Sequence, residues 1–192
     1  MKTEKILTSI FILALLAHFF NIPGHSMLLI LTVVVLTTLY FPLAFYFYSD
    51  KTLRQQNIAL SVLGGIVLAI IPIGILFKLL TWPGYQVQLG TAIILTPILL
   101  VVTLLLYKKS NAELKSYYKN FLTRITFWLL MCIVFYFISV VTLIKIEYRN
   151  EPELMTLKIQ SFENPENADY YDAIDNYYRQ QDSIALANEM PK

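Results

Sequence analysis

The most regular feature of this chain is a series of apolar runs, each about as long as a membrane-spanning helix. A helix needs about 20 mostly apolar residues to cross a hydrocarbon core roughly 30 Å thick, because it rises about 1.5 Å per residue. Five runs meet this condition, over residues 6–22, 26–48, 57–80, 88–107 and about 125–144, and none contains Asp or Glu. The pattern predicts an all-α integral membrane protein with about five transmembrane helices.

The charge distribution divides the chain into two parts. Only 15% of the 192 residues are charged, against about a quarter in soluble domains. Residues 1–144 hold ten Lys/Arg and three Asp/Glu, a net charge of +7, whereas residues 145–192 hold five and ten, a net charge of −5. We therefore expect a transmembrane domain over residues 1–146 and an acidic, Tyr-rich soluble tail over residues 147–192. No basic patch suits nucleic acid, so the expected partners are the lipid bilayer and other membrane subunits or further copies of the chain.

Basic residues in the short loops predict the orientation. Lys and Arg resist translocation, so they accumulate on the cytoplasmic side. Nine of them fall on alternate loops, namely Lys2, Lys5, Lys51, Arg54, Lys108, Lys109, Lys115, Lys119 and Arg124, while the loops at 23–25 and 81–87 carry none. We expect a cytoplasmic N-terminus and a periplasmic tail in the cell inner membrane. No Ala-x-Ala cleavage site follows the first run, so we expect a retained helix rather than a signal peptide.

The first four runs form a repeat of two helical hairpins. The turns contain Pro23-Gly24 in the first hairpin and Trp82-Pro83-Gly84 in the second, at an offset of 60 residues. Proline ends a helix and glycine permits the reversal that follows. The predicted architecture is therefore two Pro-Gly-turned helical hairpins plus a fifth helix, with a short amphipathic helix in the C-terminal tail.

Two polar residues precede these turns at equivalent positions and are candidate polar contacts. His18 and Lys78 each lie five residues before the proline of their hairpin. Lys78 can either extend its stem to the headgroups or make a functional polar contact within the protein. His18 can be hydrogen-bonded to a neighbour or can take part in proton-linked chemistry.

Small residues mark one face of the third helix. Ser61, Gly65 and Ala69 recur every four residues, and Pro72 follows. Such a stripe allows membrane helices to approach closely, and an internal proline removes a backbone donor and bends the helix. The feature predicts helix packing with a kink, or alternatively a hinge or binding cavity.

The tail contains one amphipathic pattern. Asn164-Pro165 is a helix-start signal, and aromatic and aliphatic residues then recur at helical spacing up to a frayed end near Met190-Pro191. The face consists of Tyr170, Tyr171, Ile174, Tyr177 and Tyr178. Tyrosine offers contact area with a polar tip, so the helix is either folded back on the membrane domain or available for partner docking.

The chain lacks the residue patterns of common catalytic sites. There is no Ser/His/Asp set, no His-x-x-x-His and no phosphate-binding glycine loop, and the single cysteine, Cys132, has no companion ligand. We also expect no buried carboxylate of the kind that proton- or sodium-driven carriers use. The sequence predicts a protein that is not an enzyme, with no catalytic residues, no metal ligands and no cofactors.

The second hairpin resembles one found in a known family. Gly74, Leu76, Phe77, Lys78, Trp82, Pro83 and Gly84 match a Gly-x-Leu-Phe-Lys-x-x-His-Trp-Pro-Gly phrase, with Thr81 in place of His. This is similar to Bacteroidota membrane proteins related to GldL, of the gliding-motility and type IX secretion machinery. The resemblance covers about 35 residues per hairpin and implies a helical hairpin in a bacterial inner membrane. Motor function, which in that family depends on a membrane carboxylate, does not carry over.

Together these features predict a multi-pass membrane protein that acts as a non-catalytic subunit or scaffold of a bacterial inner-membrane complex. The alternative is a small transporter or channel for a neutral or anionic solute, using the Pro72 kink and Lys78.

Overall fold

The computed structural model of the protein describes residues 2–40 and 57–189, and every regular element in these ranges is a helix. The chain divides into two compact units, Met1–Ile138 and Ser139–Lys192. The first unit contains α1 (Lys2–Phe19), α2 (His25–Tyr40), α4 (Ile58–Leu79), α5 (Tyr85–Lys109) and α6 (Ala112–Phe137). The second unit contains α7 (Val140–Glu147), α8 (Pro152–Glu163) and α9 (Ala168–Glu189).

Three of the described helices, α4, α5 and α6, are long and apolar enough to cross a membrane, and α2 is a shorter apolar helix. The predictions of an all-helical fold and of transmembrane helices are thereby confirmed. Residues 41–48 of the predicted second span lie outside the described residues, together with Lys51 and Arg54 of the loop that follows.

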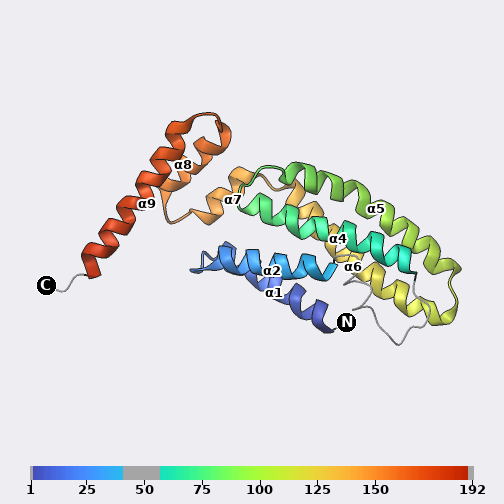
Figure 1. Ribbon diagram of the computed structural model, residues 1–192. Helices are drawn as coiled ribbons and strands as arrows, with labels where there is room; N and C mark the ends of the chain where they lie inside the picture. The colour runs from blue at the N-terminus through green and yellow to red at the C-terminus, as the bar shows by residue number, and fades with distance from the viewer. Residues whose placement is uncertain (1, 41–56, 190–192) are drawn as a thin grey trace. The chain divides into compact units, whose positions relative to one another are not determined.

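The helices of the first unit pack lengthwise (Figure 1). Helix α5 lies against both α4 and α6, α2 packs against α4, and α1 packs against α2. At Gly64 on α4, an added Cβ would lie 2.2 Å from Cζ of the buried Phe121 on α6. The absence of a side chain at Gly64 is therefore what lets α4 and α6 approach closely.

The predicted small-residue stripe lies along this part of α4. Ser61 and Gly65 are buried, and Ala69 is partly exposed. The Ser61 hydroxyl is hydrogen-bonded to the Tyr117 hydroxyl on α6. Pro72 is buried inside α4, which continues as a helix through it.

The two Pro-Gly turns have left-handed backbone at matching positions. Gly24 and Gly84 have φ values of +81° and +92°, and Asn21 and Thr81, again 60 positions apart, have φ values of 53° and 55°. Both turns lie at the same end of the first unit (Figure 1). Left-handed backbone is easy for glycine and tolerable for asparagine, but it is strained for β-branched threonine.

The hydrogen bonds of the two turns also correspond. The amide of Ile22 donates to Ala17 O at 3.0 Å, and the amide of Trp82 donates to Phe77 O at 2.7 Å. This six-residue closure, with a left-handed residue inside it, is a Schellman end for each preceding helix. The repeat expected from the sequence therefore extends to the conformation of the turn.

The fifth apolar run does not form one helix over residues 125–144. Helix α6 already begins at Ala112 and ends at Phe137, and α7 begins at Val140 in the second unit. Ile138 and Ser139 between them have extended backbone, with ψ values of 133° and 142°. No proline or glycine marks this break. The predicted span therefore included these two residues, because the sequence on both sides of them is apolar.

The second unit contains more structure than the sequence suggested. The tail helix α9 begins at Ala168, three residues after Pro165, because Pro165 and Glu166 form a turn instead of the first helical turn. Helix α8, which was not expected, has Pro152 at its first position and packs against α9. The compact unit starts at Ser139, whereas the tail was expected from residue 147.

The strained threonine of the second turn provides a test of the repeat. We predict that Thr81→Asn, which installs the residue of the first turn, stabilises the protein by roughly 0.5–1 kcal/mol, because asparagine adopts left-handed backbone at lower cost. The free energy of unfolding in detergent micelles measures the effect. Gly84→Ala in the same turn should lower the free energy of unfolding by roughly 1 kcal/mol. A lower free energy of unfolding in Thr81→Asn would contradict the idea that left-handed backbone at Thr81 reduces the stability of the protein.

Candidate functional site at the contact of α1 and α6

The first unit contains a buried acidic residue, Glu4. Helix α1 starts at Lys2, four residues before the apolar run, and this places Glu4 in its first turn. The Glu4 side chain is buried, with 5% of the residue exposed. The expectation of no buried carboxylate concerned the apolar runs, whereas Glu4 lies just before the first of them, in a helical turn that hydropathy does not mark.

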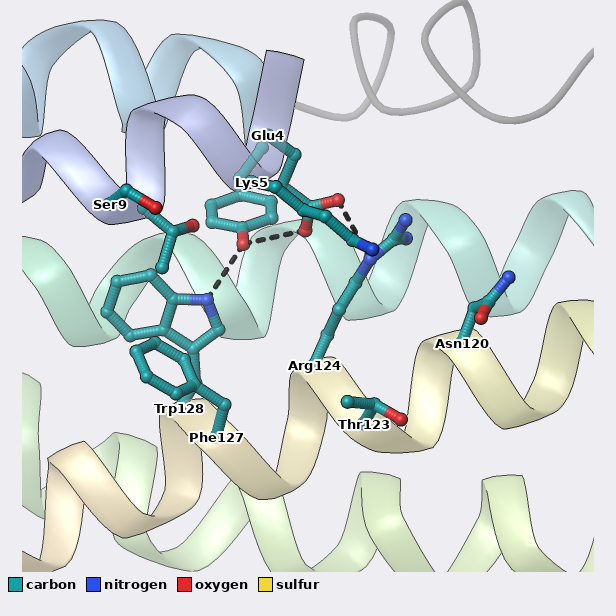
Figure 2. A pocket seen from close by; sticks show the side chains of 10 residues that line it. Glu4, Lys5, Ser9, Asn120, Thr123, Arg124, Phe127 and Trp128 are labelled. Carbon is teal, nitrogen blue, oxygen red and sulfur yellow. Dashed lines mark hydrogen bonds and ion pairs between the residues drawn. The ribbon is translucent and has the colours of Figure 1, made fainter. Parts of the chain in front are cut away.

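Both oxygens of the Glu4 carboxylate are bound by other helices. Arg124 Nε on α6 lies 2.8 Å from Glu4 Oε2. The Tyr40 hydroxyl on α2 donates to Glu4 Oε1 at 2.9 Å and accepts a hydrogen bond from Trp128 Nε1 at 2.7 Å. Figure 2 shows Arg124 and Trp128 rising from α6 towards Glu4. We call these four residues the Glu4 network.

Aromatic packing encloses the network on its apolar side. The Trp128 ring lies 5.6 Å from the Phe11 ring of α1 and 6.1 Å from the Tyr40 ring, measured between centroids. Trp128, Tyr40 and Phe11 are all fully or almost fully buried. The network therefore joins α1, α2 and α6 through contacts that exclude water and strengthen the electrostatic attraction.

A cavity of about 470 Å³ adjoins the network. Its walls come from the first turns of α1, from the end of α2 and from α6 (Figure 2). The described lining residues are Glu4, Lys5, Thr8, Ser9, Tyr40, Asn120, Thr123, Arg124, Phe127 and Trp128. Charged and hydroxyl groups thus line the same cavity as three aromatic side chains, Tyr40, Phe127 and Trp128.

Lys78, one of the two predicted polar contacts, is buried near the opposite end of the first unit. Only 4% of the residue is exposed, and its Nζ donates to Tyr136 O at 3.1 Å. Tyr136 lies in the last turn of α6, where backbone carbonyls lack a partner within the helix and the helix dipole favours a cation. Lys78 therefore binds the C-terminal end of α6, and its ammonium group also lies 5.3 Å from the Tyr85 ring.

His18, the equivalent residue of the first hairpin, makes the equivalent contact. Its Nδ1 lies 2.9 Å from His25 Nδ1, and His25 corresponds to Tyr85 at the 60-residue offset. A separation of 2.9 Å between two ring nitrogens requires a proton on one of them. In both hairpins the polar residue of the first helix thus contacts the first residue of the second helix.

The predicted docking residues of the tail are divided by the structure. Ile174 is buried, Tyr170 and Tyr177 are partly exposed, and Tyr171 and Tyr178 are exposed. The Tyr177 hydroxyl donates to Glu151 Oε2 at 3.3 Å. The predicted face therefore serves partly as the contact with α8 and partly as free surface.

A lysine on α8 organises the centre of this unit. Lys158 Nζ lies 5.9 Å from the centroid of the Tyr148 ring and 5.7 Å from that of Tyr178. Burial lowers the pKa of Lys158, while the nearby carboxylates of Glu147 and Asp175 act in the opposite direction. The lysine is a cation held between two aromatic rings.

The sequence reasoning did not identify the Glu4 network. Glu4 and Arg124 are 120 positions apart. The sequence pattern placed Arg124 in a basic loop and gave Glu4 no role. The signal that was available is their rarity, since Glu4 is one of only three acidic residues before residue 145. Comparison of the chain with protein-family models, curated proteins and solved structures found no match.

The Glu4 network makes a specific prediction for stability. Glu4→Gln should destabilise the protein by about 3 kcal/mol, near the low end of the range for breaking a buried ion pair, because Arg124 keeps its charge and loses the carboxylate. Thermal unfolding in micelles measures the loss, and Trp128 emission, read in a Trp82→Phe background, should shift to the red. Glu113→Gln is the matched control, since Glu113 lies exposed in the first turn of α6 and should change stability by under about 0.5 kcal/mol. Equal stability of the two variants would contradict a structural role for the pair.

The Lys78 contact makes a second prediction. In Lys78→Met, amide hydrogen exchange in the last turn of α6 should accelerate by about one order of magnitude, because a hydrogen bond from a charged group contributes roughly 1.5–3 kcal/mol. Lys78→Arg retains a donor and should preserve most of the protection. Unchanged exchange in Lys78→Met would mean that another group binds the Tyr136 carbonyl equally well.

Proposed function

We propose that this chain is a non-catalytic subunit of a bacterial inner-membrane complex, which the first unit anchors in the bilayer and the second unit connects to a partner. In this proposal α1, α2, α4, α5 and α6 are the five membrane crossings. The N-terminus is cytoplasmic and the tail periplasmic. Support for this orientation comes from the basic residues, which cluster at the end of the first unit opposite the two Pro-Gly turns, as Lys5 on α1 and Lys108 to Lys119 around the α5–α6 loop.

The contacts of the polar residues within the first unit support a structural role. The Glu4 carboxylate binds Arg124 and Tyr40, Lys78 binds the end of α6, and Ser61 binds Tyr117. Each of these groups joins two helices. Their interactions explain why polar residues are retained in an apolar bundle without requiring a reaction.

The observation that carries the proposal is the exposure of two tyrosines on α9, one of which, Tyr178, also flanks Lys158 of α8. Tyr171 and Tyr178 are seven residues apart, so they lie on one side of the helix, with 49% and 44% of their surface exposed. Asp175 lies exposed between them. We call these three residues the acidic tyrosine face. Tyrosine is enriched at protein-binding surfaces, and the Asp175 carboxylate gives this surface a negative charge.

Charge indicates the chemistry of the partner. The residues from 145 onward carry five basic and ten acidic side chains, and this excess of negative charge attracts a basic surface. The expected partner is therefore a protein with a basic periplasmic segment. The resemblance of the second hairpin to relatives of GldL supports a partner among bacterial inner-membrane assemblies.

Transport of a solute past Lys78 has weaker support. The ammonium group of Lys78 already donates to Tyr136 O and lies against the Tyr85 ring. A solute using this charge would have to displace a contact that binds the end of α6. We therefore retain the subunit proposal as the principal one.

The acidic tyrosine face can be tested directly. In native membranes solubilised with mild detergent, the parent chain should migrate in a high-mass complex on blue native electrophoresis. Tyr171→Ser should reduce that complex at least fivefold, because truncating a tyrosine that acts as a binding hot spot costs about 2 kcal/mol or more. Tyr171→Phe is the matched control, since it keeps the ring and should keep the complex. Raising the salt concentration should weaken the complex by screening the charges.

Two results would overturn the proposal. One is migration of the parent chain as a monomer under these conditions. The other is an equal effect of Tyr171→Ser and Tyr171→Phe, which would exclude the ring as a binding contact.

A further inference from the structure

The cavity beside the Glu4 network lies where the sequences of α1 and α6 both change from charged to apolar residues. On α1 the charged residues end at Lys5 and the apolar run begins at Ile6. On α6 they end at Arg124 and the apolar sequence continues from Ile125. A change from charged to apolar residues on neighbouring helices is typical of the boundary between headgroups and hydrocarbon.

The polar end of the cavity favours an anion. Lys5 and Arg124 both line it, whereas Glu4 is the one carboxylate among the described lining residues. Both oxygens of that carboxylate are already bound, by Arg124 and by Tyr40. Among the described lining residues, no second carboxylate compensates the positive charge of Lys5, whose side chain is exposed.

Hydrogen-bond donors line the same cavity as Lys5. Thr8 and Ser9 of α1 contribute hydroxyl groups and Asn120 of α6 contributes an amide, whereas the Thr123 hydroxyl already donates to Lys119 O at 3.0 Å. A phosphate group presents several acceptor oxygens at once and suits a set of hydroxyl, amide and cationic donors. A simple halide would use the charge but not this number of donors.

The other end of the cavity is aromatic. Phe127 and Trp128 line it, next to the start of the apolar part of α6. A ligand that fills both ends therefore has an anionic head and an apolar body. Basic pockets between membrane helices on the cytoplasmic side bind anionic lipid headgroups by this combination.

We propose that this cavity binds the phosphate group of an anionic phospholipid, with Lys5 contacting the phosphate and Phe127, beside the buried Trp128, contacting the first part of the acyl chains. The binding is independent of the proposed partner of the tail, because every lining residue belongs to the first unit. A bound lipid would add contacts between α1 and α6 at the level of the Glu4 network.

The test uses the full chain with Trp82→Phe, which leaves Trp128 as the sole tryptophan. Purified protein in detergent micelles is titrated with dihexanoyl phosphatidylglycerol, and Trp128 emission is followed. A saturable change is expected, and dihexanoyl phosphatidylcholine should bind at least several-fold more weakly. Inorganic phosphate is titrated separately to distinguish a lipid headgroup from a free anion.

Lys5→Gln should weaken the binding of phosphatidylglycerol roughly fivefold, since a basic residue contributes about 1 kcal/mol to attraction of an anionic lipid. Lys119→Gln is the matched control, because Lys119 is exposed on α6 and does not line the cavity. The thermal unfolding temperature of each variant verifies folding. The described contacts include no ion pair of Lys5, so Lys5→Gln is expected to fold as the parent does.

Three results would overturn the proposal. They are an absence of saturable change with phosphatidylglycerol, equal binding of phosphatidylcholine, and equal affinities in the Lys5→Gln and Lys119→Gln variants. Binding of inorganic phosphate as tight as that of phosphatidylglycerol would support a phosphate site and overturn its assignment to lipid. None of these outcomes depends on whether the tail binds a partner.

Discussion

The buried carboxylate of Glu4 constrains how the helices of the first unit pack. A charge removed from water needs an opposite charge and hydrogen-bond donors in direct contact with it. Arg124 supplies the opposite charge and Tyr40 supplies a second donor. These partners come from α6 and α2, so the position of α1 is tied to two other helices. A single buried group thus turns three apolar helices, which could otherwise slide along one another, into an arrangement with one favoured register.

The two hairpins show how a repeated backbone can carry different chemistry. The turns share left-handed residues at the same positions and a corresponding six-residue hydrogen bond. Within this common geometry, His18 contacts His25 in the first hairpin, while Lys78 contacts Tyr85 in the second. Lys78 additionally binds the end of α6. The second hairpin is therefore bound to α6 by Lys78, next to its turn. The first hairpin is bound to α6 by the Glu4 network.

The two units use polar residues differently. In the first unit, buried polar groups bind one another across helices, where an unpaired group would be costly. In the second unit, Lys158 lies between the rings of Tyr148 and Tyr178, and Tyr171 remains exposed on α9. The same residue type, tyrosine, is thus an internal hydrogen-bonding partner in α2 and a surface group in α9.

Local sequence properties determined much of the architecture. The apolar runs identified α4 and α5 closely, since helix formation and membrane insertion depend on residues near in sequence. The Pro-Gly pairs located both turns because those residues constrain the backbone wherever they occur. The tail helix was also found, although its start was placed too early because proline at 165 occupies a turn. The break at Ile138 was not found, as no residue there disfavours a helix.

Only the tertiary structure decided which polar residues matter. Glu4 and Arg124 are each unremarkable beside the other charged residues near them, and their pairing depends on how α1 and α6 pack. Lys78 could have extended to the headgroups, but the end of α6 lies within its reach and offers a backbone carbonyl. Such contacts join positions 58 and 120 residues apart, and no pattern within one helix encodes them. The sequence by itself determined where the helices are, while packing determined which charges are buried and what compensates them.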